Sequence, residues 1–257
     1  MGGQPKLKRI YTRQQRANHT GFQFLDNAIK NLNLNVEFDR KQLAHIPEHG
    51  PVLFVANHPY GVLDGIVLTW LAMQVRPEVK VLANSVLNQA QEIRPHLLPI
   101  DFSTSKEAVA TTIASRGMAL AALKQGDAIG IFPGGGVSTS PKPMKGPALD
   151  LEWIPFTARL IHQSQATVVP IYFSGQNSRL FQLASHISPT LRLSLIFHET
   201  VRRMGTSIKI RIGDPIQYDE ISDMRDRDAL VKYLRKMTFA LAARPEIDWM
   251  KATKLRA

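Results

Sequence analysis

Residues 52–73 of the chain read VLFVANHPYGVLDGIVLTWLAM, and this stretch predicts the fold. Its first five residues are all apolar and follow Gly50-Pro51, which is typical of a strand buried on both faces. Residues 66–73 form a second apolar run, which we interpret as a buried helix. A buried strand followed by a buried helix is the repeating unit of α/β proteins, whose helices cover the faces of a parallel or partly parallel sheet.

The same alternation of strands and helices continues along the chain. Apolar runs and alternating patterns predict further strands at residues 34–38, 79–83, 97–100, 128–132, 167–173, 191–197 and 208–212. Helical spacing and caps predict helices at residues 22–32, 104–126, 154–163 and 226–241, the second of which begins at a capping box formed by Thr104 and Glu107. We therefore expect a single α/β domain over residues 21–257, with a mixed, partly parallel sheet flanked by helices.

The composition restricts the classes of partner. The 257 residues include 32 Lys and Arg against 21 Asp and Glu, for a formal net charge of +11, which favours polyanionic partners. No nucleic-acid-binding motif accompanies this charge, so no nucleic acid is expected. The absence of cysteine excludes disulfides, thiolate metal sites and cysteine nucleophiles. No apolar run reaches the ~18 residues of a membrane-spanning helix, and no secretory signal is recognisable.

The first 20 residues are expected to form a basic N-terminal arm. Five basic residues precede Asp26, the first acid: Lys6, Lys8, Arg9, Arg13 and Arg16. Two interpretations remain open, a solvated arm or an anchor on anionic lipid or RNA.

The first loop of chemical interest follows the strand at residues 52–56. His58 leaves this strand, Pro59 and Gly61 enforce a turn, and Asp64 stands where the next helix begins. A carboxylate on one imidazole nitrogen fixes the tautomer, which leaves the other nitrogen to take a proton from an alcohol. In the structural alternative, Asp64 caps the helix and His58 is hydrogen-bonded within a turn.

The second loop follows the strand at residues 128–132 and reads PGGGVST over residues 133–139. Three successive glycines allow backbone amides to approach and surround an anionic group. The loop is neither a P-loop nor a dinucleotide-binding GxGxxG motif. Ser138 and Lys142 add donors and positive charge. A plain flexible turn is the alternative.

The two loops together resemble the PlsC-type glycerolipid acyltransferases. The resemblance rests on Asn57-His58 with Asp64, on FPGGGVS at residues 132–138 and on VPIY at residues 169–172, and it spans roughly residues 50–215. It implies transfer of an acyl group to a lysophospholipid or a lyso-aminolipid, as in a 1-acylglycerol-3-phosphate O-acyltransferase, from acyl-CoA or acyl-carrier protein as donor. Carried over, His58 is the general base and Asp64 its orienting partner. The implied substrate-binding residues are Asn57, Gly134, Gly135, Gly136, Val137, Ser138 and Lys142.

Two departures from the family pattern concern these motifs. Five residues instead of four separate His58 from Asp64, a form similar to the hemolysin-related branch that includes acyltransferases of ornithine-lipid synthesis. Gly134 stands where the family has a glutamate associated with acceptor binding, and Lys142 or Arg159 are candidate electrostatic substitutes.

The resemblance further implies a protein peripheral to the membrane, on the cytoplasmic face of the inner membrane, with anionic lipid as its partner surface. No metal and no cofactor are expected, and six further histidines lack the spacing of a zinc site: His45, His49, His96, His162, His186 and His198. A basic stretch of Arg192, Arg202, Arg203, Lys209 and Arg211 is either a patch facing membrane or phosphopantetheine, or a solvated strand face. The alternative function is a noncatalytic module that binds anionic lipid or nucleic acid and retains the fold.

Overall fold

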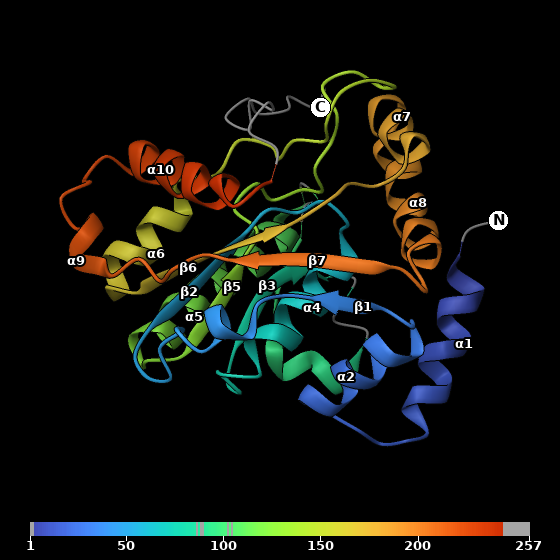
Figure 1. The fold of residues 1–257 in the computed structure, drawn as a ribbon, viewed down its shortest axis with the longest axis horizontal. Coiled ribbons are helices and arrows are strands. Elements are labelled where there is room, and N and C mark those ends of the chain that lie inside the picture. The colour runs from blue at the N-terminus through green and yellow to red at the C-terminus, as the bar shows by residue number, and fades with distance from the viewer. Residues whose placement is uncertain (1–2, 86, 88–89, 102, 104, 244–257) are drawn as a thin grey trace.

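A computed structural model describes residues 3–85, 87, 90–101, 103 and 105–243 of the chain (Figure 1). Across these residues, seven strands form one sheet in the order β1-β7-β6-β2-β5-β3-β4. The strands are β1 (Asn35–Glu37), β2 (Val52–Ala56), β3 (Lys80–Asn84), β4 (Leu97–Ile100), β5 (Ala128–Ile131), β6 (Thr167–Phe173) and β7 (Ser207–Ile212). The five strands from β6 to β4 are parallel. Because β7 is antiparallel to β6 and parallel to β1, the predicted mixed sheet is confirmed.

Helices cover both faces of the sheet, as the sequence predicts (Figure 1). One face packs against α2 (Gly21–Asn31) and α4 (Val62–Ala72), and the other against α5 (Lys106–Lys124), α6 (Phe156–Ser164) and α10 (Arg227–Ala240). The remaining helices are α1 (Gln4–Gln15), α3 (Arg40–Leu43), η2 (Gln91–His96), α7 (Arg179–Ile187), α8 (Pro189–Arg202) and α9 (Tyr218–Ile221). The expected single α/β domain is therefore observed.

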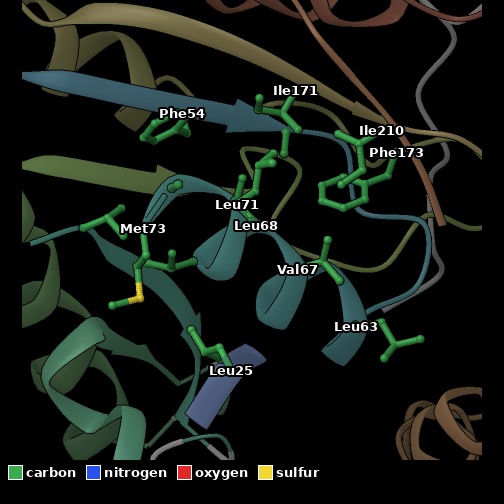
Figure 2. Close-up of a cluster of buried hydrophobic side chains, with 14 of the residues drawn as sticks. Leu25, Phe54, Leu63, Val67, Leu68, Leu71, Met73, Ile171, Phe173 and Ile210 are labelled. Atoms are coloured by element: carbon green, nitrogen blue, oxygen red, sulfur yellow. The ribbon is translucent and has the colours of Figure 1, made fainter. Parts of the chain in front are cut away.

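Most residues of the helix α4 are apolar and buried, and the helix lies in the centre of one core. Leu68 and Leu71 of α4 belong with Phe54 of β2 and Ile171 of β6 to a single buried cluster, which also contains Leu25 of α2 (Figure 2). Each such side chain contributes about 1.5–3 kcal/mol when it is fully buried. This packing holds the N-terminus of α4 in a defined place above the sheet.

The prediction of a strand at residues 191–197 is wrong, because these residues lie within α8. Leu191, Leu193 and Leu195 alternate with the polar residues Arg192 and Ser194, a pattern typical of a strand. Ser188 decides the local structure: its side chain accepts a hydrogen bond from the N–H of Leu191, and a proline follows it at the first helical position. Leu191 and Leu193 are exposed, so the alternation does not mark a buried strand face.

The first 20 residues include the helix α1, which contacts α2 and α8. Leu7, Ile10 and Tyr11 pack against the core, whereas the five basic residues of this segment are exposed. In the long helix α5, Ser105 is the N-cap and accepts a hydrogen bond from the N–H of Ala108. The predicted cap Thr104 lies outside the described residues. Among the helices that the structure describes, none has the length and apolar character to cross a membrane.

Candidate active site

Three neighbouring parallel strands end at the same edge of the sheet, and their loops form the candidate site. The strand β2 lies between β5 and β6, with Val55 opposite Ile131 and Ala56 opposite Ile171. The loops that leave these strands therefore emerge side by side at the carboxyl edge, where α/β proteins usually place their ligand sites. His58 leaves β2, and the glycine loop of residues 133–138 leaves β5.

The structure brings His58 and Asp64 together. Nδ1 of His58 lies 3.0 Å from Oδ2 of Asp64, and the two side chains are 18% and 0% exposed. Among the described residues Nδ1 makes no hydrogen bond, so the pair is a close contact between the imidazole and the carboxylate. Catalytic hydrogen bonds are often poorly aligned before substrate binds and tighten in the complex.

Asp64 also caps α4, so the same carboxylate both contacts His58 and starts the helix. Its Oδ2 accepts hydrogen bonds from the N–H of Tyr60 at 2.7 Å and from the N–H of Gly61 at 2.9 Å. Gly61, the N-cap residue, has φ = +80°, a conformation that favours glycine. The turn that starts α4 therefore also holds the carboxylate of Asp64 beside His58.

Burial and hydrogen bonding act in opposite directions on Asp64. Desolvation raises the pKa of its carboxyl above the ordinary value, while His58 and the N–H groups of Tyr60 and Gly61 oppose that rise. A carboxylate on Nδ1 keeps the proton of the neutral imidazole on that nitrogen. Nε2 is then the nitrogen that can accept a proton.

The imidazole of His58 is also oriented by the second loop. Its ring stacks on Phe132, the first residue after β5, with centroids 4.2 Å apart and planes inclined by 27°. No hydrogen bond from the described residues reaches Nε2, and the side chain is partly exposed. One face of the ring is therefore covered by an aromatic residue, while the basic nitrogen stays available.

The glycine loop is tied to His58 through its main chain. The N–H of Ser138 donates to the carbonyl of His58 at 2.7 Å. Gly135 has φ = +68°, so a side chain at this position would strain the backbone. A Cβ at Gly134 would lie 3.3 Å from the carbonyl oxygen of Leu151 and 3.4 Å from Cβ of Asp150, which leaves little room for a larger residue.

Sequence reasoning missed Asp150, which joins the two loops. Its Oδ1 accepts from the N–H of His58 at 3.2 Å and from the hydroxyl of Ser138 at 2.5 Å, and its Oδ2 accepts from Nε1 of Trp153 at 3.0 Å. The residue is fully buried. A signal was available, because Asp150 and Glu152 are the only acids between Asp127 and Glu199. A carboxylate in such an acid-poor stretch requires specific partners.

Three other residues singled out in the sequence have different surroundings. Both ends of the Asn57 amide are hydrogen-bonded to the main chain of Phe173, at 2.9 and 2.7 Å, so Asn57 ties the end of β2 to the end of β6. Lys142 is exposed in a turn with Lys145, and Arg159 is exposed on α6, where it contacts Gln163. No described contact joins either cation to His58 or to the glycine loop.

The basic stretch between Arg192 and Arg211 is divided between two elements. Arg192 and Arg202 lie on α8, and Arg203 directly follows it, while Lys209 and Arg211 are exposed on β7. Lys209 and Arg211 line an open hollow of 1210 Å³ along β6 and β7. No group of three or more metal-ligating side chains occurs among the residues that the structure describes.

A second cavity is apolar and lies beside the candidate site. It has a volume of 200 Å³ and is enclosed by α1, α2, α4, α8 and neighbouring segments. Val62 and Gly65, which flank the turn that carries Asp64, form part of its wall. Because its lining is almost entirely apolar, this cavity is suited to an apolar ligand.

Comparison with known proteins shows the family of the chain. A model of the acyltransferase family matches residues 22–247. A lyso-glycine lipid O-acyltransferase of Phocaeicola vulgatus is 25% identical over 231 residues, which are 87% of this chain and 79% of the relative. A protein of the same name from Bacteroides thetaiotaomicron is 25% identical over 228 residues, 86% of this chain and 80% of the relative.

Among solved structures, the 1-acyl-sn-glycerophosphate (LPA) acyltransferase PlsC from Thermotoga maritima aligns with a TM-score of 0.49 and 16% identity. The alignment covers 91% of this chain and 78% of that chain. Because the family model matches most of the sequence, including both loops of the site, this chain belongs to the acyltransferase family.

Proposed function

We propose that the protein transfers a fatty acyl group from a thioester donor, acyl-CoA or acyl-carrier protein, to the hydroxyl of a lysolipid. The observation that carries this proposal is the contact between His58 and the buried Asp64, with the ring of His58 partly exposed and its main chain hydrogen-bonded to the glycine loop. A histidine held in this way is suited to act as a general base towards an alcohol. The mechanism uses no metal ion and no cofactor.

The proposed reaction needs one proton carrier. Nε2 of His58 takes the proton of the acceptor hydroxyl. The hydroxyl oxygen attacks the carbonyl carbon of the thioester, and a C–O bond forms. Asp64 stabilises the resulting imidazolium. When the tetrahedral intermediate collapses, the C–S bond breaks, and the leaving thiolate takes the proton back from His58. The products are an ester and a free thiol.

The names of the two relatives support a lyso-aminolipid as acceptor. Both relatives are named for O-acylation of a lyso-glycine lipid, and both align over more than three quarters of their length. The sequence form around His58 is similar to the branch that includes ornithine-lipid acyltransferases. We therefore place a lyso-aminolipid before lysophosphatidic acid as the acceptor.

The apolar cavity is the proposed site of an acyl chain. Its wall contains residues on both sides of the turn that holds Asp64, so a chain in this cavity begins close to the catalytic pair. Removing a hydrocarbon chain from water contributes about 0.8 kcal/mol for each buried CH₂.

The proposed setting of the reaction is a membrane surface with anionic lipid, on the cytoplasmic face of the cell membrane. The exposed cations of α1 support this setting, since each Lys or Arg contributes about 1 kcal/mol near an anionic leaflet.

The direct test is thiol release by the purified protein. Acyl-CoA or acyl-carrier protein is supplied with a lyso-glycine lipid or with lysophosphatidic acid, and the free thiol and the acylated lipid are measured. Acceptor-dependent release in equal amounts with acylated lipid supports the proposal. A folded protein that binds lipid vesicles but releases no thiol with any pair supports the noncatalytic alternative.

A further inference from the structure

Arg192 places a guanidinium against the glycine loop. This residue lies on α8, and its NH2 nitrogen donates to the carbonyl of Val137 at 2.5 Å. The same nitrogen lies 3.7 Å from the position of a Cβ at Gly136. One turn further along α8, the side chain of Ile196 lies 3.8 Å from the position of a Cβ at Gly61, in the loop of His58. The helix α8 thus packs across both loops of the site.

The charge of Arg192 has no acidic partner among the described residues. Its contacts there are the carbonyl of Val137 and the ring of Phe181, over which the guanidinium lies at 5.6 Å from the centroid. Glu199, the only acid on α8, is buried and accepts hydrogen bonds from the N–H and the hydroxyl of Ser178. Most of the five N–H donors of Arg192 are therefore left for another acceptor.

The two buried arginines among the described residues, Arg76 and Arg235, differ from the half-buried Arg192 in this respect. Arg76 contacts Glu78 at 2.7 Å and donates to three main-chain carbonyls. Arg235 donates to two carbonyls and experiences the negative charges of Asp150 and Glu152. Both of these arginines have the partners that a buried cation needs for structural reasons.

Arg192 is half-buried. Desolvation lowers the pKa of its guanidinium to about 10, so the group is still a cation at neutral pH. A desolvated cation without a counter-charge costs free energy, and an anion that binds beside it recovers that cost. The planar guanidinium matches the two oxygens of a carboxylate or a phosphate.

We propose that Arg192 binds the anionic head group of the acceptor, a carboxylate or a phosphate, beside the glycine loop. This inference rests on the proposed function, because it takes the occupant of the loop to be the lysolipid. Arg192 then selects charged over neutral acceptors and orients the acceptor while His58 takes the hydroxyl proton. A glycine joined to a fatty acyl group through its nitrogen carries such a carboxylate.

The experiment measures binding without chemistry. Three soluble probes differ only in the head group: N-octanoylglycine, its neutral amide N-octanoylglycinamide, and octyl phosphate. Their dissociation constants are measured by titration calorimetry with wild type, Arg192→Gln, Arg192→Lys and Arg202→Gln. Arg202 is the matched control, because it is an exposed arginine on the same helix.

Wild type and Arg202→Gln are expected to bind at least one anionic probe about 10-fold or more tightly than the amide, the range of a charge-assisted pair. Arg192→Gln loses this preference and keeps its affinity for the amide, while Arg192→Lys keeps part of the preference. The stronger of the two anionic probes identifies carboxylate or phosphate. If Arg192→Gln does not fold, the proposal is tested by two results: the preference of wild type for the anionic probes, and a smaller preference in Arg192→Lys.

Equal binding of all three probes by wild type, an undiminished preference in Arg192→Gln, or no measurable binding would overturn the proposal. The His58→Ala variant separates this inference from the proposed function. It keeps the anion preference if Arg192 acts as described, whether or not the wild-type protein transfers an acyl group. A wild type with the anion preference but without any thiol release would contradict the proposed function alone.

Discussion

The main-chain N–H of His58 donates a hydrogen bond to the carboxylate of Asp150, 3.2 Å away and 92 residues further along the chain. The hydroxyl of Ser138 donates to the same carboxylate oxygen, and the N–H of Ser138 donates to the carbonyl of His58. The backbone of His58 is therefore held on one side by Asp150 and on the other by Ser138 of the second loop. This arrangement makes the position of the proposed base depend on residues far from it in sequence.

Replacement of Asp150 by alanine is expected to impair both stability and turnover. The buried N–H of His58, hydroxyl of Ser138 and indole N–H of Trp153 lose their acceptor, at a cost of about 1–3 kcal/mol for each group left unsatisfied. We expect Asp150→Ala to lower Tm by several degrees and kcat by about 10-fold or more. Glu152→Gln, at an exposed acid two residues away, is the control and is expected to leave both unchanged. A wild-type Tm and kcat in Asp150→Ala would show that Asp150 does not hold the site.

Valine at Gly135 is expected to affect the acceptor more than the donor. The positive φ of this residue disfavours a β-branched side chain, so the loop must shift. Steady-state kinetics with each substrate varied in turn should show a rise in KM for the acceptor and little change for the donor. Gly50→Val is the matched control, because Gly50 also has positive φ but lies before β2. Equal changes for both substrates would indicate a purely structural turn.

The strands of the central sheet and the order of the two loops were predictable from the sequence. Short buried apolar runs, such as residues 52–56 and 167–173, can adopt few structures other than a strand in a chain of this length. The pairing of His58 with Asp64 was also predictable, since both residues belong to one turn. The role of Asp150 was not, because it depends on a contact across 92 residues that no local pattern encodes.

In the helix α8, a local sequence pattern predicted the wrong secondary structure. Its alternating leucines predicted a strand, yet the cap at Ser188 and the packing against α7 produce a helix. For the same reason the orientation of Arg192 could not be read from its position in a basic stretch. The packing of α8 across the glycine loop decides which of the basic residues faces the site.

The buried carboxyl of Asp64 predicts an unusual dependence of stability on pH. Its pKa is raised in the folded protein, so it contributes stability below the ordinary carboxyl value of ~3.9, and this contribution is lost as the pH rises through the folded value. Because asparagine does not ionise, Asp64→Asn removes this loss of stability at higher pH. The Tm of Asp64→Asn relative to wild type should therefore increase as the pH rises above about 4, while its thiol release falls. A difference in Tm that does not change over this range, or that decreases, would contradict the assignment.

Membrane binding should depend on the exposed cations of α1. Since Leu7, Ile10 and Tyr11 pack on the core, deletion of α1 would uncover apolar surface, and substitution is the cleaner test. We expect glutamine at Lys6, Lys8, Arg9, Arg13 and Arg16 to weaken sedimentation with anionic vesicles at low salt. Wild-type binding should itself decrease at high salt, as the Debye length shrinks. Glutamine at Lys232 and Lys236, which are exposed on α10, is the control. Undiminished, salt-independent binding by the five-fold variant would exclude an electrostatic role for α1.

The central claim is that His58 is the base of an acyl transfer, and a single comparison tests it most directly. Acceptor-dependent thiol release is measured for wild type, His58→Ala and the exposed-site control His49→Ala, with folding verified by circular dichroism and Tm. The account predicts that folded His58→Ala is slower by about 10²- to 10⁴-fold, the usual contribution of general base catalysis, and that His49→Ala equals wild type. Turnover close to that of wild type in folded His58→Ala would contradict the account.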